Sequence, residues 1–214
     1  MTDNKSDPDP KSDLAYVRAM TERAARAPLL GGRFLLLWGG LLVLTYLGHF
    51  AVITGFAGLP VETLAFLWPA FGIFGALGTV LLSRNTAPKP GAFAVGNVVQ
   101  REIWQGAGLG ILLFVIGVIL ATMQGASPIM FDMIAAVALA LYGAAFLATA
   151  AASQLRWMRV PAWISFFAAA GVPLLAGSSL LYLALAGVVV LVSVVPGLIL
   201  MRHEPPALHT AEQV

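Results

Sequence analysis

Residues 160–201 read VPAWISFFAAAGVPLLAGSSLLYLALAGVVVLVSVVPGLILM and contain no charged side chain. As one α-helix this segment would be about 63 Å long at 1.5 Å per residue. The hydrocarbon core of a bilayer is only about 30 Å thick. The segment therefore has to cross a membrane twice, with a turn inside it. Small polar residues mark turns, so we expect this turn at Gly177-Ser178-Ser179.

Four other uncharged runs have the length of a membrane crossing, which needs about 20 mostly apolar residues. They occupy residues 34–61, 63–83, 103–131 and 133–155. Together with the two halves of the last run they predict six helices, near 34–54, 64–83, 103–123, 133–153, 160–176 and 180–201. We therefore expect an all-α integral membrane protein whose transmembrane domain, residues 33–202, is a six-transmembrane-helix bundle.

The composition excludes an ordinary soluble protein. Of 214 residues, 59% are hydrophobic and only 10% are charged, whereas a soluble domain has roughly a quarter charged residues. The mean hydropathy is +0.89. Because the chain has no cysteine, disulfides, thiolate metal sites and thiol catalysis are excluded as well.

The basic residues predict how the chain lies in the membrane. All 12 Lys and Arg residues precede the first predicted helix, follow the last one, or fall between helices two and three or four and five. The connections near 55–63, 124–132 and 177–179 contain none. Basic residues collect on the cytoplasmic side of a membrane. We therefore expect a multi-pass protein of a bacterial cytoplasmic (inner) membrane, with both termini in the cytoplasm.

The terminal segments have a different composition from the helices. Residues 1–13 are polar and rich in Pro and Asp, so we expect a disordered cytoplasmic tail there, and another at 203–214. Apolar residues recur at helical spacing in 14–27, at Leu14, Val17, Met20 and Ala24. This pattern predicts a short amphipathic helix on the membrane surface; the alternative is a solvated lead-in to the first span. Pro and Gly in 85–100 indicate a linker.

Small residues at four-residue spacing predict where the helices pack. Lipid tails provide no hydrophobic drive between helices, so small residues that allow close backbone approach mark their interfaces. The third predicted helix contains Gly106, Gly110 and Gly117, and the second contains Gly72 and Gly75. The fourth contains a regular row of alanines at Ala136, Ala140, Ala144, Ala148 and Ala152. A general abundance of alanine would also produce such a row. Either way, the expected role is packing within the bundle or with a partner.

Three ionisable residues near the outer side of the predicted bundle form the candidate site. His49 lies about 21 Å along the first helix from Leu35, and Glu62 and Asp132 precede the second and fourth helices. Ionisable groups in a bilayer are costly and suggest function, and histidine titrates near neutrality. We predict an ion, proton or solute site at these residues. In the alternative interpretation, His49 binds a backbone carbonyl while the two carboxylates cap helix starts in water.

Residues at the inner ends of the helices have the chemistry of lipid anchors. Tryptophan favours the membrane–water interface, and arginine favours lipid phosphates. We expect lipid-facing anchors at Arg101, Trp104, Arg156, Trp157 and Arg159.

Two functional hypotheses follow, and neither includes catalysis, a metal or a cofactor, because the common enzyme motifs are missing from the sequence. The first is a non-catalytic accessory, scaffold or regulatory subunit that binds a membrane-protein partner, or further copies of itself, by helix packing. The alternative is a small-solute or cation transporter, or the substrate-binding subunit of one, with its site near His49 and Asp132. The absence of a basic stripe excludes a nucleic-acid partner. The repeat pattern leaves open three parallel hairpins or two inverted halves.

Overall fold

The computed structural model describes residues 28–56, 58–86 and 92–204, and this part of the chain is helical, with no strand. The α-helices are α2 (Gly32–Ile53), α3 (Leu64–Thr86), α4 (Val95–Met123), α5 (Met130–Ser153), α6 (Arg159–Leu175), α7 (Leu180–Val189) and α8 (Val195–Arg202). Short 3-10 turns precede α3 and α6, as η1 (Val61–Thr63) and η2 (Arg156–Met158). A π-helical turn, η3 (Val190–Val194), joins α7 to α8.

The expected all-helical architecture with six apolar spans is confirmed. Six helices are long and apolar enough to cross a membrane, and the last of them combines α7, η3 and α8. The predicted turn inside residues 160–201 is present between α6 and α7, where Gly177 has a φ of +81°. This left-handed conformation is one that glycine adopts without steric cost.

One boundary prediction is wrong. Residues 95–100 belong to α4, which begins at Val95, and not to a linker that extends to residue 100. The sequence argument ended at the charged Arg101 and Glu102, whereas the helix continues through them to the buried Gln100 and Asn97. These polar residues are tolerated because they are buried against the segment that leads into α2: Asn97 Oδ1 accepts a hydrogen bond from Leu30 N, 2.8 Å away.

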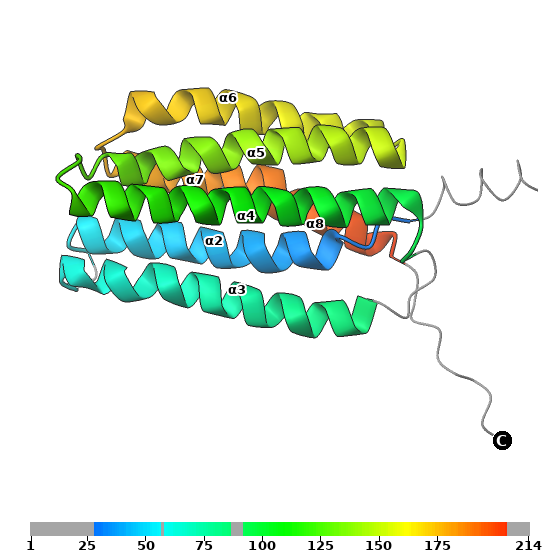
Figure 1. The fold of residues 1–214 in the computed structure, drawn as a ribbon, viewed down its shortest axis with the longest axis horizontal. Coiled ribbons are helices and arrows are strands. Elements are labelled where there is room, and N and C mark those ends of the chain that lie inside the picture. Colours follow the sequence, from blue (N-terminus) through cyan, green and yellow to red (C-terminus); the bar gives the residue numbers. More distant parts are fainter. Residues whose placement is uncertain (1–27, 57, 87–91, 205–214) are drawn as a thin grey trace, which may run out of the picture.

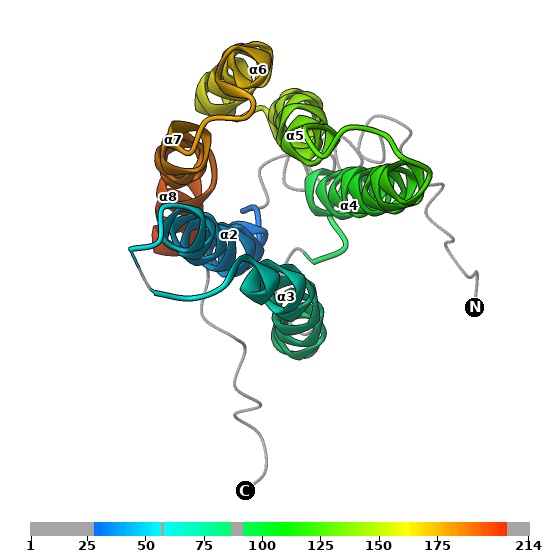
Figure 2. The ribbon, with the colours of Figure 1, turned by 90° about the vertical axis from the view of Figure 1, so that its left-hand side faces the viewer.

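The six spans form a ring that follows the order of the sequence (Figure 2). Helix α5 packs between α4 and α6, α6 packs on α7, and α2 packs against α7 and α8 on one side and α3 on the other. The packed series is therefore α3, α2, α7–α8, α6, α5 and α4, so that the first and last spans of the sequence pack together and α3 and α4 are the two ends of the series. In Figure 1 the same helices run side by side along the bundle.

The ring order matches three hairpins, α2–α3, α4–α5 and α6–α7. Inverted halves are related by an axis in the membrane plane. Such an axis would reverse the order of the second three spans around the ring relative to the first three. Figure 2 instead shows α2, α3, α4, α5, α6 and α7 following one another in one direction around the bundle.

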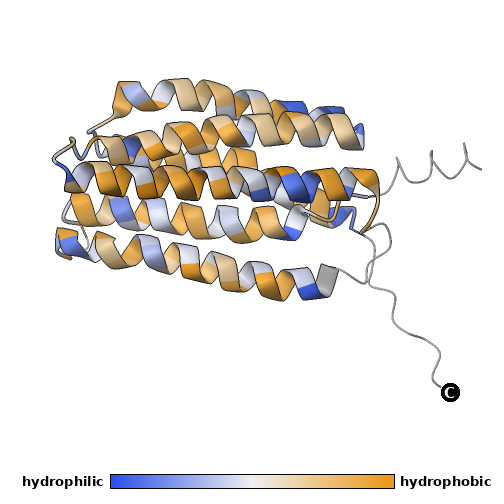
Figure 3. Cartoon of the chain, viewed as in Figure 1, coloured by the Kyte–Doolittle hydropathy of each residue, from blue (hydrophilic) through white to orange (hydrophobic). Residues whose placement is uncertain are grey.

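The two ends of the bundle differ in charge. Figure 3 shows hydrophilic residues towards both ends of the helices, with hydrophobic residues along most of their length. We call the end with the α2–α3, α4–α5 and α6–α7 connections the distal end and the opposite one the proximal end. The described arginines all lie at the proximal end, at positions 33, 84, 101, 156, 159 and 202. The distal end has no lysine or arginine within the described ranges, and its acidic residues there are Glu62 and Asp132.

The packed interior consists of two apolar clusters at different depths between the distal and proximal ends. The first lies between α2, α5, α6 and α7, and its buried members are Leu42, Tyr46, Ala135, Leu139, Val172, Leu181, Leu185, Ala186 and Val189. The second lies nearer the proximal end, and its buried members are Leu29, Leu35, Phe146, Ala150, Met158, Ala162, Val192 and Leu200.

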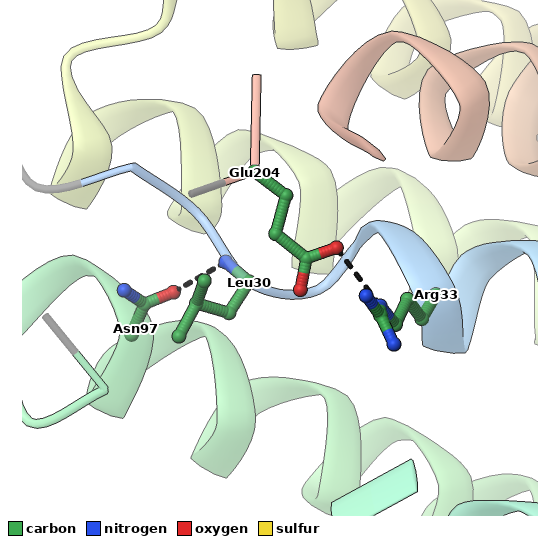
Figure 4. A network of polar contacts seen from close by, with 4 residues as sticks. All are labelled: Leu30, Arg33, Asn97 and Glu204. Carbon is green, nitrogen blue, oxygen red and sulfur yellow. Dashed lines mark hydrogen bonds and ion pairs between the residues drawn. The ribbon is translucent and has the colours of Figure 1, made fainter. Parts of the chain in front are cut away.

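Polar contacts at the proximal end fix the entry into α2 (Figure 4). Asn97 of α4 accepts from Leu30 N and donates through Nδ2 to Pro28 O, 2.9 Å away. Arg33 pairs with Glu204, with Nε 3.0 Å from Oε2. The predicted tail 1–13 and amphipathic helix 14–27 lie outside the described residues. So does the predicted tail 203–214, apart from its first two residues.

Candidate functional site

Asp132 of α5 is buried and binds the connection between α6 and α7. Its side chain is placed in the first turn of α5, and the residue is only 7% exposed. Oδ2 accepts a hydrogen bond from Gly177 N at 2.7 Å, and Oδ1 accepts one from the Tyr182 hydroxyl at 2.5 Å. Hydrogen bonds to both oxygens compensate the carboxylate for the water that it loses on burial. The first turn of a helix also favours negative charge.

His49 reaches the same group of residues from α2. Its imidazole stacks on the Tyr182 ring, with centroids 3.6 Å apart and planes 16° from parallel. Its Nδ1 atom lies 3.1 Å from the indole Nε1 of Trp68 on α3. Because an indole nitrogen only donates hydrogen bonds, Nδ1 is the acceptor. In this arrangement His49 is neutral and carries its proton on Nε2.

The contacts join into one chain across the distal part of the bundle: Trp68, His49, Tyr182, Asp132 and Gly177. We call these five residues the distal network. It connects α3 and α2 to α7, α5 and the α6–α7 turn. These helices are therefore held together at the distal end. Tyr46 supports it from α2, because its ring lies edge-on to that of Trp68 at 5.6 Å.

The structure therefore brings two of the three candidate site residues together and leaves the third outside. His49 and Asp132 both contact Tyr182, on its ring and on its hydroxyl respectively. Glu62 is exposed in η1, and its side chain has no hydrogen bond or ion pair within the described residues. Among those residues, no three His, Asp or Glu side chains gather to hold a metal ion.

Sequence reasoning did not identify Trp68 and Tyr182 as parts of the site. Each is an aromatic residue inside an apolar run, where lipid contact is the ordinary expectation. One signal was present: each lies within two turns of the distal end of its helix, at the depth of His49. That depth alone does not reveal on which face of its helix each aromatic side chain lies.

The distal network is suited to holding a buried carboxylate and a neutral imidazole in fixed positions. Asp132 accepts hydrogen bonds from two donors and His49 accepts one. These donors and acceptors of the distal network therefore satisfy one another without water. The arrangement can act as a structural tie. It can also relay a proton or hold a polar solute if the Tyr182 hydroxyl or His49 Nε2 changes partner.

The small residues singled out from the sequence occupy both inner and outer faces. A Cβ at Gly75 would lie 2.4 Å from the Trp38 ring, and one at Gly110 would lie 3.4 Å from Leu141. At Gly72, Gly106 and Gly117 it would meet no atom within 4 Å. In the alanine row, Ala140 and Ala144 are exposed, while Ala136 and Ala148 are partly buried.

Other small residues also lie at close helix contacts. Gly32 of α2 lies against Gly197 of α8, Gly39 lies against Ser193 of η3, and Gly143 of α5 lies against Phe166 of α6. The π-helical turn places the Ser193 hydroxyl 2.8 Å from Leu35 O, to which it donates. Pro196 is the second residue of α8, just after this turn, and has no N–H to donate to the preceding turn of helix.

Of the five residues expected to face lipid, the three arginines are exposed and the two tryptophans are partly buried. Arg101, Arg156 and Arg159 are exposed at the proximal end. Trp104 and Trp157 are partly buried and pack against the proximal apolar cluster. In particular, the Trp104 ring lies edge-on to Tyr142 and Phe146, at 5.1 Å and 4.9 Å between centroids.

Comparison with known proteins gives no relative: no family model, curated protein or solved structure matches this chain.

Proposed function

We propose that this chain is a non-catalytic accessory, scaffold or regulatory subunit of a membrane complex, and that it binds its partner by helix packing along α4 and α5. The observation that carries this proposal is the outer face of α4. Gly106 and Gly117 are exposed there, and a Cβ at either position would meet no atom within 4 Å. Ala140 and Ala144 of the adjoining α5 are also exposed.

Small exposed residues matter more in a membrane than in water. Helices in lipid associate through close packing, which Gly and Ala permit, and not through a hydrophobic drive. The space beside Gly75, Gly110 and Gly143 is filled by side chains of this chain, namely Trp38, Leu141 and Phe166. The open glycines of α4 have the same chemistry and no internal neighbour, so a helix of another membrane protein fits them.

The position of α4 in the ring supports this proposal. Only 11% of its span is buried, and 6% of the α3 span, against 28% to 44% in the other four. These two spans end the series of packed helices (Figure 2). A partner helix can therefore approach α4 without displacing an internal contact.

The proposal includes a location in a bacterial cytoplasmic membrane, with the proximal, arginine-rich end in the cytoplasm. Since the chain has no cysteine, single cysteines report orientation without background. We expect a membrane-impermeant maleimide to label Ser127→Cys at the distal end in intact cells. It should label His203→Cys at the proximal end only after permeabilisation. Labelling of His203→Cys in intact cells would contradict the proposed orientation.

Photo-cross-linking in the native membrane tests the proposed partner surface. A photoreactive residue is placed at Leu113 on α4 (59% exposed) and, as a control, at Leu183 on α7 (45% exposed). We expect Leu113 to give one discrete cross-linked product that contains a second membrane protein, and Leu183 to give products with lipid. Identical patterns from the two positions would count against a partner surface on α4.

The distal network favours a second candidate function, a small-solute or cation transporter with its site at His49 and Asp132. The supporting observation is the Tyr182 side chain, which contacts both residues. Transport of a charged substrate would require the Asp132 carboxylate itself, whereas a structural tie requires only its hydrogen-bonding capacity. The Asp132 variants described below separate these two roles.

A further inference from the structure

The α2–α3 connection, residues 54–63, exposes large apolar side chains at positions where a loop ordinarily has polar ones. Phe56 is 89% exposed, more than any other large apolar residue in the described part of the chain. Leu59 and Val61 are 49% and 60% exposed. Exposed apolar surface of this kind marks a contact with another protein or with lipid.

The backbone of the connection places Phe56 in a tight turn. Gly55 and Gly58 both have a positive φ, +71° and +61°, which glycine adopts without steric cost. Gly58 N donates to Gly55 O, and Gly55 N donates to Val52 O, both at 3.1 Å. The turn is therefore closed by backbone hydrogen bonds, and the Phe56 side chain is not needed to hold it.

The lengths of α2 and α3 place this connection at one surface of a bilayer. Arg33 and Arg84 lie near the proximal ends of the two helices. From Arg33 to Ile53, and from Arg84 back to Leu64, each helix rises about 30 Å at 1.5 Å per residue. The hydrocarbon core is about as thick as this, and a headgroup region adds several ångströms on each side. The connection therefore begins where the hydrocarbon core ends.

The connection combines groups that favour lipid with groups that favour water. Its exposed Phe, Leu and Val side chains gain free energy when they leave water. Irregular backbone, by contrast, is not tolerated against hydrocarbon, and the exposed Glu62 carboxylate is costly there. The headgroup region provides both environments within a few ångströms. Because the connection contains no Lys or Arg, its contact with lipid has to be apolar.

The neighbouring surface of α3 favours lipid as the partner of the connection. Phe66, Ile73 and Leu77 are 77%, 58% and 57% exposed, and their spacing places them on one face of the helix. This apolar face leads to the connection. The other two distal connections differ, because residues 124–128 read QGASP and residues 176–179 read AGSS, without a large apolar side chain.

We propose that the α2–α3 connection inserts Phe56, Leu59 and Val61 into the lipid headgroup region at the distal surface of the membrane, while the α4–α5 connection stays in water at Ser127. The inference requires that the helices cross a bilayer. It does not depend on the partner surface on α4, or on which end of the bundle is cytoplasmic.

Fluorescence quenching at single cysteines tests this placement. Since the chain has no cysteine, Phe56→Cys and the control Ser127→Cys can each be labelled with one NBD dye. The full-length protein is reconstituted in phosphatidylcholine vesicles at a high ratio of lipid to protein, so that no partner protein covers the connection. Quenching is measured with iodide on both sides of the membrane. It is measured again with phosphatidylcholine that carries a nitroxide near the top of its acyl chain.

We expect iodide to quench the dye at position 56 several-fold less than the dye at position 127, and the nitroxide lipid to quench it several-fold more. Leu59→Cys retains Phe56 and should behave like Phe56→Cys; it provides the same test if Phe56→Cys is not recovered folded. Equal quenching at positions 56 and 127 would overturn the proposal. So would shielding of position 56 in native membranes that is lost in the vesicles, because a protein would then cover the connection.

Discussion

Replacing Gly197 with leucine should prevent the protein from folding, at a cost of more than about 3 kcal/mol in the free energy of unfolding. A Cβ at this position would lie 2.9 Å from Leu36 Cγ and 3.0 Å from Gly32 O. Because the second atom belongs to the backbone of α2, a side-chain rotation cannot make room. The helices α2 and α8 would have to separate, together with the Ser193–Leu35 hydrogen bond beside them.

A matched control lies ten residues earlier in the same span. Gly187 of α7 is exposed, and a Cβ there would meet no atom within 4 Å. Gly187→Leu should therefore be folded like the wild type. The measurement is the fraction of monodisperse protein after detergent extraction, followed by a denaturant titration. Equal stability of Gly197→Leu and Gly187→Leu would mean that α2 and α8 do not cross as described.

Removal of the Asp132 side chain should have the second-largest effect. Asp132→Ala leaves Gly177 N and the Tyr182 hydroxyl without their acceptor. With about 1 kcal/mol for each hydrogen bond between helices in a membrane, we expect a loss of about 2 kcal/mol. Asp132→Asn should cost less than half of this, since its carbonyl still accepts from Gly177 and its amide can donate to the tyrosine oxygen.

The comparison of these two variants also distinguishes the two candidate functions. If the distal network is a structural tie, Asp132→Asn should behave like the wild type in growth and partner binding. If Asp132 takes part in transport of a cation, the same variant should abolish flux in liposomes while it remains folded. Similar losses of stability in Asp132→Ala and Asp132→Asn would contradict the hydrogen-bond arrangement at Tyr182 and Gly177.

Hydropathy predicted the spans because a bilayer imposes a minimum length on each apolar run. The turn at Gly177 followed from the same length argument. The start of α4 did not, because Asn97 and Gln100 are polar and only their contacts with Leu30 and Gly31 make burial favourable. A hydropathy criterion cannot include an interaction between residues that are distant in sequence.

The candidate site was predicted in part for a similar reason. His49 and Asp132 stand out because ionisable groups are rare in these spans, and both belong to the distal network. Tyr182 completes it, but its role depends on where α7 lies relative to α2 and α5. The small residues show the same limit. Four-residue spacing identified Gly110 as a contact residue, but the shapes of neighbouring helices decide that Gly197 is enclosed while Gly106 is open.

Composition of the purified complex tests the central claim most directly. The tagged full-length protein is extracted from its native membrane in mild detergent, and its mass and chain content are determined. We predict a second membrane-protein chain in fixed ratio. The double variant Gly106→Leu/Gly117→Leu should lose this second chain, and Gly187→Leu should retain it. If the complex contains several copies of this chain and no other protein, the partner is a second copy of the chain itself. A wild-type monomer, or a partner that the double variant retains, would contradict the account.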